Sequence, residues 1–220
     1  YYTIRKGNNL FDDEDISSFS VSDNRRLSNS SVSFLNTENN EGSPTISDNG
    51  KLLIYTSCEM NFKKNSCDLY YLEKRGNSWT EPMKMSENVN SDYWDSQPFL
   101  YGNMLFFVSN RPGGTGGRDI YFTKKSGGEW AKAVNYNEVN SSYEEVSPFV
   151  REGILYFSSD RINSFGGYDL FLLDGLESKN KIVSNLGSSI NSHLDESSIF
   201  LTDDLIFYTT EDKLDQNVKS

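Results

Sequence analysis

One hairpin motif occurs three times in this chain and limits the folds that the chain can adopt. The clearest copy is Ser109–Tyr121, S-N-R-P-G-G-T-G-G-R-D-I-Y, which follows the apolar run Met104–Val108. Its glycines and proline cannot lie inside a helix or strand, so they predict a long hairpin connection. A second copy, Ser159–Phe171, keeps the arginine, a Gly-Gly pair and the aspartate, and a third, Ser57–Tyr70, keeps the serine, aspartate and tyrosine. Three copies of one hairpin indicate a repeat protein.

A second motif precedes the hairpins and gives the repeat its length. It consists of an apolar residue, an asparagine and a serine or threonine, followed by an acidic residue and, in three of four copies, a proline. The copies begin at Leu35, Val89, Val139 and Ile190. The proline position falls at residues 44, 98, 148 and 199, so successive copies are 54, 50 and 51 residues apart. A repeat of about 50 residues is typical of propeller blades.

Each repeat is predicted to contain four short strands joined by hairpins. Runs rich in apolar, β-branched and aromatic residues alternate with turn sequences such as Asp48-Asn49-Gly50. The predicted strands are Thr45–Ser47, Leu52–Thr56, Leu69–Lys74 and Trp79–Met85, then Phe99–Leu100, Met104–Val108, Ile120–Lys124 and Trp130–Val134, then Phe149–Val150, Ile154–Ser158, Leu170–Leu173 and Lys181–Leu186. Four antiparallel strands per repeat predict an all-β fold, a β-propeller.

The two ends of the chain are predicted to share one blade. Tyr1–Asn8 is similar to Tyr70–Asn77, which predicts the third strand of a repeat, with the fourth strand before Leu35. Ile199–Thr210 supplies the first two strands of a repeat. Such a composite blade would close a ring of four blades; the alternative is a part of a larger propeller. The propeller domain is predicted over residues 1–211, with a solvated, acidic and serine-rich insertion at 10–29 and a polar tail at 212–220.

Charge and hydropathy exclude several functions. The chain carries 21 basic and 32 acidic residues, a net charge of −11, which argues against binding to nucleic acid or anionic membranes. No apolar run approaches the roughly 20 residues that a membrane span needs. The chain begins at Tyr1 without a methionine, and we interpret it as a mature or trimmed segment of a longer protein.

Two cysteines lie at the feet of the first hairpin. Alignment of the three hairpins places Cys58 at the end of the second strand and Cys67 just before the third. Paired positions of this kind lie about 4.5–5.5 Å apart, which suits a disulfide. The sequence therefore predicts a Cys58–Cys67 bridge and an oxidising compartment; the alternative is two free thiols in a cytosolic protein.

One acidic residue per repeat precedes the first strand, which is innermost in a propeller. Four facing carboxylates would repel one another, so a ring of them invites a hard cation such as Ca²⁺. The alternative is that each carboxylate accepts backbone N–H bonds or pairs with Arg111 or Arg161. No other cofactor is predicted. The candidate ligands are Glu41, Asp95, Glu145 and Glu196.

The hairpin residues themselves are predicted to be structural. An aspartate directly after the loop can accept hydrogen bonds from the loop's own backbone amides. We expect the arginines of the loop to stack on rings or to form ion pairs. The aspartates are Asp68, Asp119 and Asp169, and the arginines are Arg111 and Arg161.

Aromatic residues near the acidic positions are candidates for binding a partner. Trp94 breaks the repeat pattern, and with Tyr93 and Tyr143 it could form an exposed patch next to Asp95 and Glu145. The alternative is that these rings cover the edge of a core.

Catalysis has little support in the sequence. The single histidine, His193, lies on a polar connection, and no G-x-S-x-G motif accompanies it. The G-G-T-G-G stretch lacks the Lys-Ser/Thr and the helix of a phosphate-binding loop. We therefore expect no enzymatic activity.

Taken together, the repeat resembles a known family. The unit E-x-S-P-x-x-S-x-x-G-K-x-L-x-Y-x-S, followed by N-R-x-G-G-x-G-G-x-D-I-Y, is similar to TolB-type, WD-like propeller repeats, and most similar to the propellers of OmpA-family envelope proteins of Bacteroidetes. The resemblance covers Leu35 to Thr210, although the first repeat lacks the glycines.

That resemblance implies a non-catalytic interaction scaffold, periplasmic and associated with the outer membrane. Its partners would be proteins of an outer-membrane or type IX secretion and gliding complex, with peptidoglycan bound by domains outside this chain. The alternative function is a carbohydrate-binding or glycoside-hydrolysing propeller that uses the acidic ring.

Overall fold

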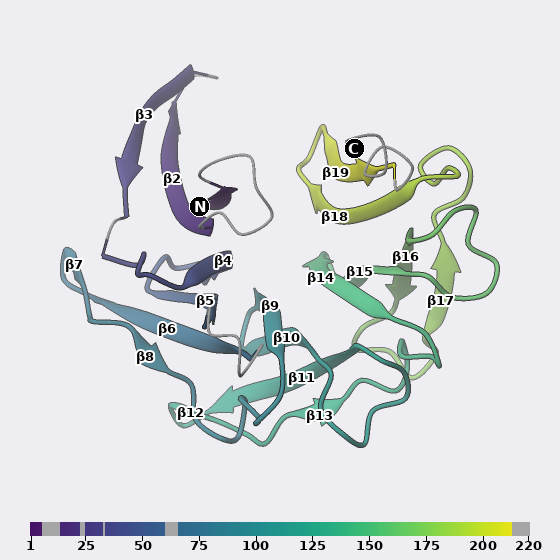
Figure 1. Cartoon of the computed structure of the whole chain (residues 1–220), viewed down its shortest axis with the longest axis horizontal. Helices are drawn as coiled ribbons and strands as arrows, with labels where there is room; N and C mark the ends of the chain where they lie inside the picture. Colours follow the sequence, from purple (N-terminus) through teal and green to yellow (C-terminus); the bar gives the residue numbers. More distant parts are fainter. Residues whose placement is uncertain (6–13, 23–24, 33, 60–65, 213–220) are drawn as a thin grey trace, which may run out of the picture. The chain divides into compact units, whose positions relative to one another are not determined.

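The computed structural model describes residues 1–5, 14–22, 25–32, 34–59 and 66–212 (Figure 1). Every regular element in these residues is a β-strand, so the predicted all-β class is confirmed. The chain divides into two compact units. The first comprises Tyr1–Leu105 and Thr123–Ala133, and the second comprises Phe106–Phe122 and Val134–Ser220. No helix in the described residues is long and apolar enough to cross a membrane.

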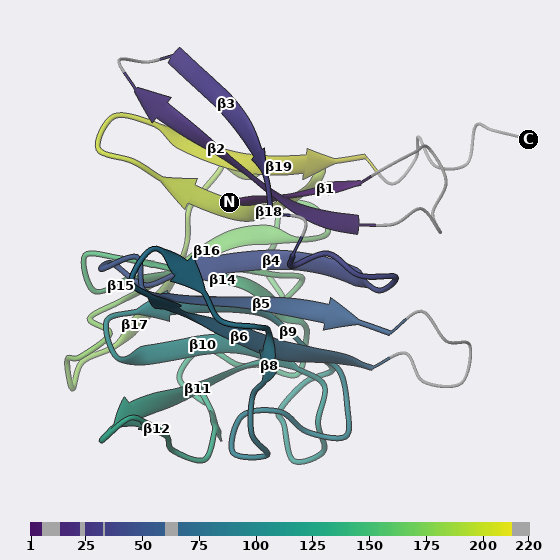
Figure 2. The same ribbon diagram turned by 90° about the vertical axis from the view of Figure 1, so that its left-hand side faces the viewer.

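The first unit contains two antiparallel sheets. The sheet of three strands has the order β1-β2-β3, and the next sheet has the order β4-β5-β6-β7 with β8 also paired to β6. Figure 2 shows β4, β5 and β6 running across the view as neighbours in this sheet. The strands are β1 (Tyr2–Arg5), β2 (Glu14–Ser22), β3 (Arg25–Ser31), β4 (Asn40–Ile46), β5 (Leu52–Cys58), β6 (Cys67–Arg75), β7 (Ser78–Trp79) and β8 (Met83–Lys84).

A third sheet contains the boundary between the two units, which passes through β10 and β11. Its order is β12-β11-β10-β9, and β13 also pairs with β11. All six residues of β10 are buried, as expected for a strand covered on both faces. Its strands are β9 (Asp95–Tyr101), β10 (Met104–Ser109), β11 (Asp119–Ser126), β12 (Glu129–Trp130) and β13 (Val134–Asn135).

The second unit continues with a sheet of four strands and one of two. Their orders are β14-β15-β16-β17 and β18-β19. Successive strands are neighbours, as the hairpin pattern of the sequence predicts. The strands are β14 (Glu145–Arg151), β15 (Ile154–Ser159), β16 (Asp169–Asp174), β17 (Ile182–Asn185), β18 (Asp195–Leu201) and β19 (Ile206–Glu211).

The innermost strand of each repeat contains a bulge that the sequence did not reveal. Ser43, Ser147 and Ser198 have positive φ angles of 49°, 54° and 53°, and Gln97 has 53°. Each precedes the proline position of the repeat, and the strand register shifts there in β4, β14 and β18. A proline has no N–H to donate to a ladder, so a bulge is the position in a strand that accepts it.

A repeated asparagine bond shows which strand of a blade each element is. The side chain of Asn90 bonds the backbone N–H and C=O of Leu69 in β6, the third strand of its sheet. Asn140 bonds Ile120 in β11, and Asn191 bonds Leu170 in β16, in the same way. Asn36 bonds both backbone groups of Ile16, at 2.9 and 3.1 Å. Because Ile16 lies in β2, this bond identifies β2 as the third strand of a repeat.

The N-terminal prediction is therefore corrected. Because β2 is a third strand, β1 is a second strand, and the assignment of Tyr1–Asn8 as a third strand was wrong. Residues 10–29, expected to be a solvated insertion, contribute β2 and most of β3, and Ile16 is buried in a core with Leu53 and Leu72. Asp15 precedes Ile16 as Asp119 precedes Ile120, and this correspondence in the sequence could have identified β2 as a third strand. The composite blade and the number of blades stay predictions.

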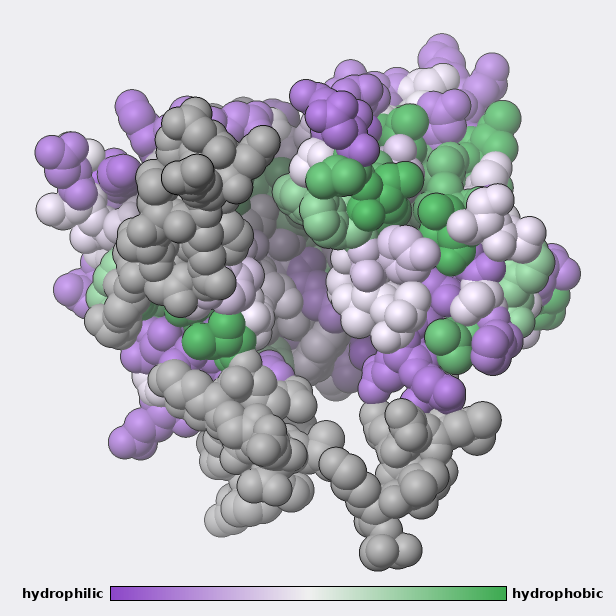
Figure 3. Space-filling model, turned by 90° about the horizontal axis from the view of Figure 1, so that it is seen from above, coloured by the Kyte–Doolittle hydropathy of each residue, from purple (hydrophilic) through white to green (hydrophobic). Residues whose placement is uncertain are grey.

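The last strand is open to solvent along its whole length. All six residues of β19 are exposed, including Ile206 and Phe207, which are 54% and 52% exposed. Apolar surface is visible on the face drawn in Figure 3, where β18 and β19 lie.

Candidate functional site

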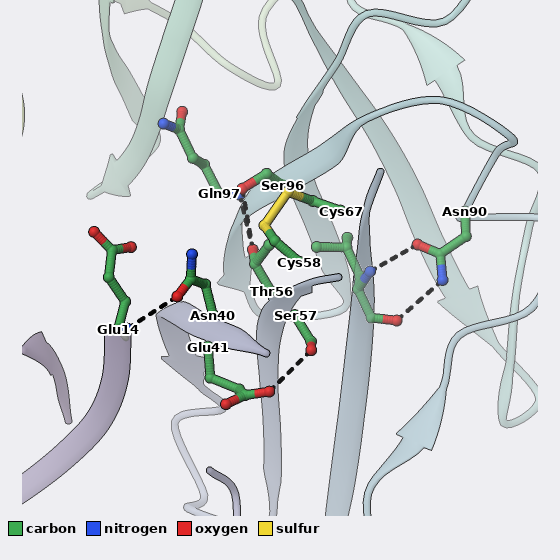
Figure 4. The surroundings of a disulfide bond; sticks show 11 residues. Glu14, Asn40, Glu41, Thr56, Ser57, Cys58, Cys67, Asn90, Ser96 and Gln97 are labelled. Carbon is green, nitrogen blue, oxygen red and sulfur yellow. Dashed lines mark hydrogen bonds between the residues drawn. A yellow bond between two sulfur atoms is a disulfide. The ribbon is translucent and has the colours of Figure 1, made fainter. Parts of the chain in front are cut away.

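The four predicted acidic residues lie inside the first strands of their sheets and are buried. Each carboxylate accepts hydrogen bonds from the backbone N–H and the hydroxyl of the serine or threonine four residues earlier. Glu41 also accepts a bond from Ser57 at 3.0 Å (Figure 4). Glu145 accepts bonds from Ser159 and Arg161, both at 2.9 Å. The carboxylates thus fasten the connection before each first strand.

These contacts correct one expectation and favour the alternative to another. Asp95 and Glu145 are 0% exposed, so neither side chain can contact a partner as expected. Among the residues that the structure describes, no three His, Cys, Asp or Glu side chains are grouped to hold a metal. The geometry of Glu41, Asp95, Glu145 and Glu196 matches the structural alternative, in which carboxylates bind backbone N–H groups, and in the third repeat Arg161 as well.

The aromatic candidates are distributed over both units. Tyr93 is 47% exposed, and Trp94 is half-buried in the same unit. Tyr143 is half-buried and belongs to the second unit, where its carbonyl accepts a bond from the Gly117 amide. The structure therefore describes no common patch of these three rings.

The glycine-rich hairpin is shaped by packing. Asp119 accepts bonds from the amides of Thr115 and Gly116, at 2.5 and 3.0 Å, and Asp169 does the same for Phe165 and Gly166. A Cβ atom on Gly116 would lie 1.8 Å from the carbonyl oxygen of Tyr143. The glycines are needed because the loop lies against the next connection.

The two arginines stack on aromatic rings, and the first aspartate bonds a lysine. The Arg111 guanidinium lies 4.8 Å from the centre of the Tyr121 ring, and that of Arg161 lies 4.9 Å from Phe171. Asp68 accepts a bond from Lys84 at 2.7 Å. The loop that Asp68 was expected to fasten includes residues 60–65, which lie outside the described residues.

The first hairpin contains a disulfide in place of the glycine-rich loop. Cys58 and Cys67 are direct cross-strand partners in β5 and β6, with Cα atoms 4.0 Å apart and the sulfurs 2.00 Å apart (Figure 4). In the third sheet the residue that aligns with Cys67 is Arg118, which pairs with Glu144 and donates to the Tyr168 hydroxyl at 2.9 Å. The disulfide thus occupies the position at which Arg118 makes polar contacts in the third sheet.

The site that sequence analysis missed is a pocket between the turns of two successive repeats, within the first unit. We call it the Trp130 pocket; its volume is about 420 Å³. It is lined by the β4–β5 turn, the end of β6, the β9–β10 turn and the β11–β12 hairpin. The lining residues are Ser47, Asn49, Lys51, Leu52, Glu73, Lys74, Gly102, Asn103, Lys125 and Trp130.

Backbone hydrogen bonds fix the walls of the Trp130 pocket. The Lys74 amide donates to the Lys51 carbonyl, and the Lys125 amide donates to the Asn103 carbonyl, both at 2.8 Å. Ser47 and Asn49 bond each other at 2.8 Å and both accept from the Lys51 amide, which orders the β4–β5 turn. The polar groups of the pocket therefore stand on ordered turns.

The lining of the pocket contains one aromatic ring and several charged side chains. Trp130 is half-buried, and the Lys125 ammonium lies 5.6 Å from its ring centre. Lysines outnumber carboxylates in the lining, since Glu73 is the one acidic residue among the described residues of the pocket. A repeated Lys-x-x-x-x-Trp spacing, Lys74 to Trp79 and Lys125 to Trp130, was the signal in the sequence.

No family model and no curated protein matches the chain. The chain is similar in structure to an α-L-arabinofuranosidase from Lactobacillus brevis, with a TM-score of 0.52 and 13% identity over 78% of this chain and 65% of that one. The fold is a β-propeller. This chain therefore spans about two thirds of the length of that arabinofuranosidase.

Two further solved structures show weaker similarity. One is an endo-arabinase from Bacteroides thetaiotaomicron VPI-5482, with a TM-score of 0.47 and 14% identity over 79% of this chain and 71% of that one. The other is an α-L-arabinanase from Penicillium chrysogenum complexed with arabinobiose, with a TM-score of 0.47 and 20% identity over 76% and 56%.

These comparisons correct the family resemblance. No family model supports a TolB-like or OmpA-family assignment, and the similar structure with a TM-score above 0.5 is an α-L-arabinofuranosidase. This comparison contradicts the expected non-catalytic envelope scaffold linked to type IX secretion and the expectation of no enzymatic activity, because the protein of similar fold is an enzyme. The physical reason is that the motif residues, such as Asp119 and Gly116, build the hairpin of the fold, and a fold does not determine a function.

Proposed function

We propose that this propeller acts on carbohydrate and binds a glycan in the Trp130 pocket. The observation that carries the proposal is the half-buried Trp130 ring, which lines a pocket together with ordered polar side chains. A sugar has an apolar face, which an aromatic ring covers, and a rim of hydroxyl groups, which need donors and acceptors.

The size and lining of the pocket support this proposal. A volume of about 420 Å³ lies within the roughly 300–1,000 Å³ of small-molecule sites. Asn49 and Asn103 offer side-chain amide groups, a type of group that donates as well as accepts hydrogen bonds. The similarity to an arabinofuranosidase is in fold, and it agrees with a carbohydrate ligand.

Hydrolysis of the bound glycan is the second candidate function. Propeller glycosidases need two carboxyl groups, about 5–5.5 Å apart for retention or about 6.5–9.5 Å apart for inversion. Glu73 is the acidic residue that lines this pocket, and the acids expected to act, Glu41 and Asp95, are buried in the structure of the first unit. Binding is therefore the better supported activity of this pocket.

The disulfide supports a place for this function outside the reducing cytosol. Cys58 and Cys67 are paired, and such pairs persist in secreted and periplasmic proteins. We propose an oxidising compartment, where polysaccharides of cell walls and matrices are accessible.

The test is a glycan array followed by calorimetry on each positive oligosaccharide. We expect Trp130→Ala to weaken binding at least about tenfold, since stacking on the ring is lost. Tyr93→Ala is the matched control, because Tyr93 is exposed in the same unit and does not line the pocket. A reducing-end assay on the same oligosaccharides detects hydrolysis. The proposal fails if no glycan binds, or if Trp130→Ala binds as tightly as the wild type.

A further inference from the structure

We infer that the Trp130 pocket selects an acidic saccharide, one whose sugar units carry a carboxylate or a sulfate. This inference rests on the proposed function and specifies the ligand of the same pocket. Its basis is a local excess of positive charge in an acidic protein. Three lysines and one glutamate line the pocket, whereas the whole chain has a net charge of −11.

The three lysines have no carboxylate partner among the described residues. The ammonium of Lys125 lies 5.6 Å from the ring centre of Trp130, and that of Lys74 lies 5.8 Å from the ring centre of Trp79, which does not line the pocket. Lys51 and Lys74 are exposed and Lys125 is half-buried. The Glu73 carboxylate lies 3.7 Å from Arg75, which offsets part of its charge.

The lysines stand on segments of two sheets, and in each sheet a backbone hydrogen bond fixes the segment to its neighbour. Lys51 precedes β5, and its carbonyl accepts the amide of Lys74 in β6 at 2.8 Å. Lys125 lies in β11, and its amide donates to Asn103 in the β9–β10 turn, also at 2.8 Å. An anion in the pocket therefore meets lysines on more than one side, with Trp130 as the apolar surface.

The fold does not require these residues. The asparagines and acids that hold the strands occur in every repeat, but the lysine and tryptophan at this spacing occur only in the first two. In the third repeat Asp174 and Gly175 stand where Glu73 and Lys74 stand, and 170–186 contains no tryptophan. A set of residues restricted to the two repeats that line a pocket points to a ligand.

Aromatic and cationic groups together suit an acidic sugar. The ring covers the apolar face of the saccharide, and ammonium groups bind its carboxylate or sulfate as point charges. Each lysine contact at a partly exposed site is worth a few-fold in affinity and is weakened by salt. Several such contacts give selection over a neutral sugar.

The experiment compares an acidic oligosaccharide with its neutral counterpart. Calorimetry with the full chain measures tetragalacturonate against its methyl ester, and a sulfated tetrasaccharide against its desulfated form. We expect at least about tenfold tighter binding of an acidic member of these pairs. The sulfated pair and the uronate pair identify which anion the pocket prefers, and preference for either supports the inference.

Variants separate this inference from the proposed function. The triple variant Lys51→Gln, Lys74→Gln, Lys125→Gln should lose about tenfold or more in affinity for the acidic member and about twofold or less for the neutral one. Lys124→Gln is the matched control, because Lys124 is exposed next to Lys125 and does not line the pocket. Melting temperatures verify that all variants fold. Equal binding of the acidic and neutral members, unaffected by the triple variant, overturns the inference and leaves the proposed function intact. If no saccharide binds, both fail.

Discussion

The side-chain amide of Asn90 bonds both backbone groups of Leu69: its Oδ1 accepts from the Leu69 amide at 2.9 Å, and its Nδ2 donates to the Leu69 carbonyl at 3.0 Å. A third bond from Nδ2 reaches the carbonyl of Met85, also at 3.0 Å. Asn90 thus adds hydrogen bonds to β6 at Leu69, next to the end of its pairing with β8, as the dashed lines at Asn90 in Figure 4 show. Asn36, Asn140 and Asn191 do the same for their sheets.

Asn90→Ala should lower the free energy of unfolding by about 2–4 kcal/mol, because the buried Leu69 N–H and the Met85 carbonyl lose the bonds from Asn90, whereas the Leu69 carbonyl keeps the Met85 amide. Urea unfolding followed by tryptophan fluorescence measures this change. Asn77→Ala is the control, since Asn77 is exposed in the turn between β6 and β7 and should change stability by less than about 0.5 kcal/mol. Equal stability of the two variants would show that the bonds of Asn90 contribute nothing.

Glu145→Gln should destabilise the chain by about 3 kcal/mol and leave its response to calcium unchanged. The substitution removes the charge that pairs with Arg161, whose side chain is 16% exposed, and it disturbs the bonds from Ser141 and Ser159. The readout is the melting temperature with EDTA and with millimolar Ca²⁺. A wild-type melting temperature that rises with Ca²⁺, and a variant that does not respond, would restore the cation hypothesis.

Reduction of the Cys58–Cys67 disulfide should lower the free energy of unfolding by about 2–3 kcal/mol, as expected for a bridge that closes a short loop. Differential scanning fluorimetry with and without dithiothreitol measures the shift in melting temperature. The double variant Cys58→Ser, Cys67→Ser should melt at the temperature of the reduced wild type and ignore the reductant. Alkylation of two thiols in unreduced native protein would contradict the bridge.

Features with a local origin were predicted from the sequence. The repeat length, the hairpins and the positions of most strands follow from hydrophobic runs and turn residues, because strand formation and turn type depend on neighbouring residues. The bond from the Ser141 amide to the Glu145 carboxylate, four residues away, is local in the same sense, and the structural alternative for the acids already contained bonds from backbone N–H groups. The position of Cys58 opposite Cys67 follows from one hairpin.

Local similarity was misleading at the N-terminus. Tyr1–Asn8 resembles the end of a third strand, but the bond that identifies a third strand joins Asn36 to Ile16, which is 20 residues earlier in the chain. A sequence pattern shows that an asparagine recurs in each repeat, and it does not show which strand the asparagine bonds. That partner is decided by the pairing of strands.

The Trp130 pocket was decided by the tertiary structure alone. In the sequence, Lys51 and Asn103 are unremarkable members of polar turns, and the Lys-x-x-x-x-Trp spacing does not show that Trp130 lines a pocket with them. They line one pocket because two successive sheets place their turns side by side within the first unit. The sequence by itself determined that the chain consists of propeller repeats, since the hydrophobic period and the turn residues act over a few positions. Where charges and rings from different repeats converge depends on packing between sheets, which no local pattern contains.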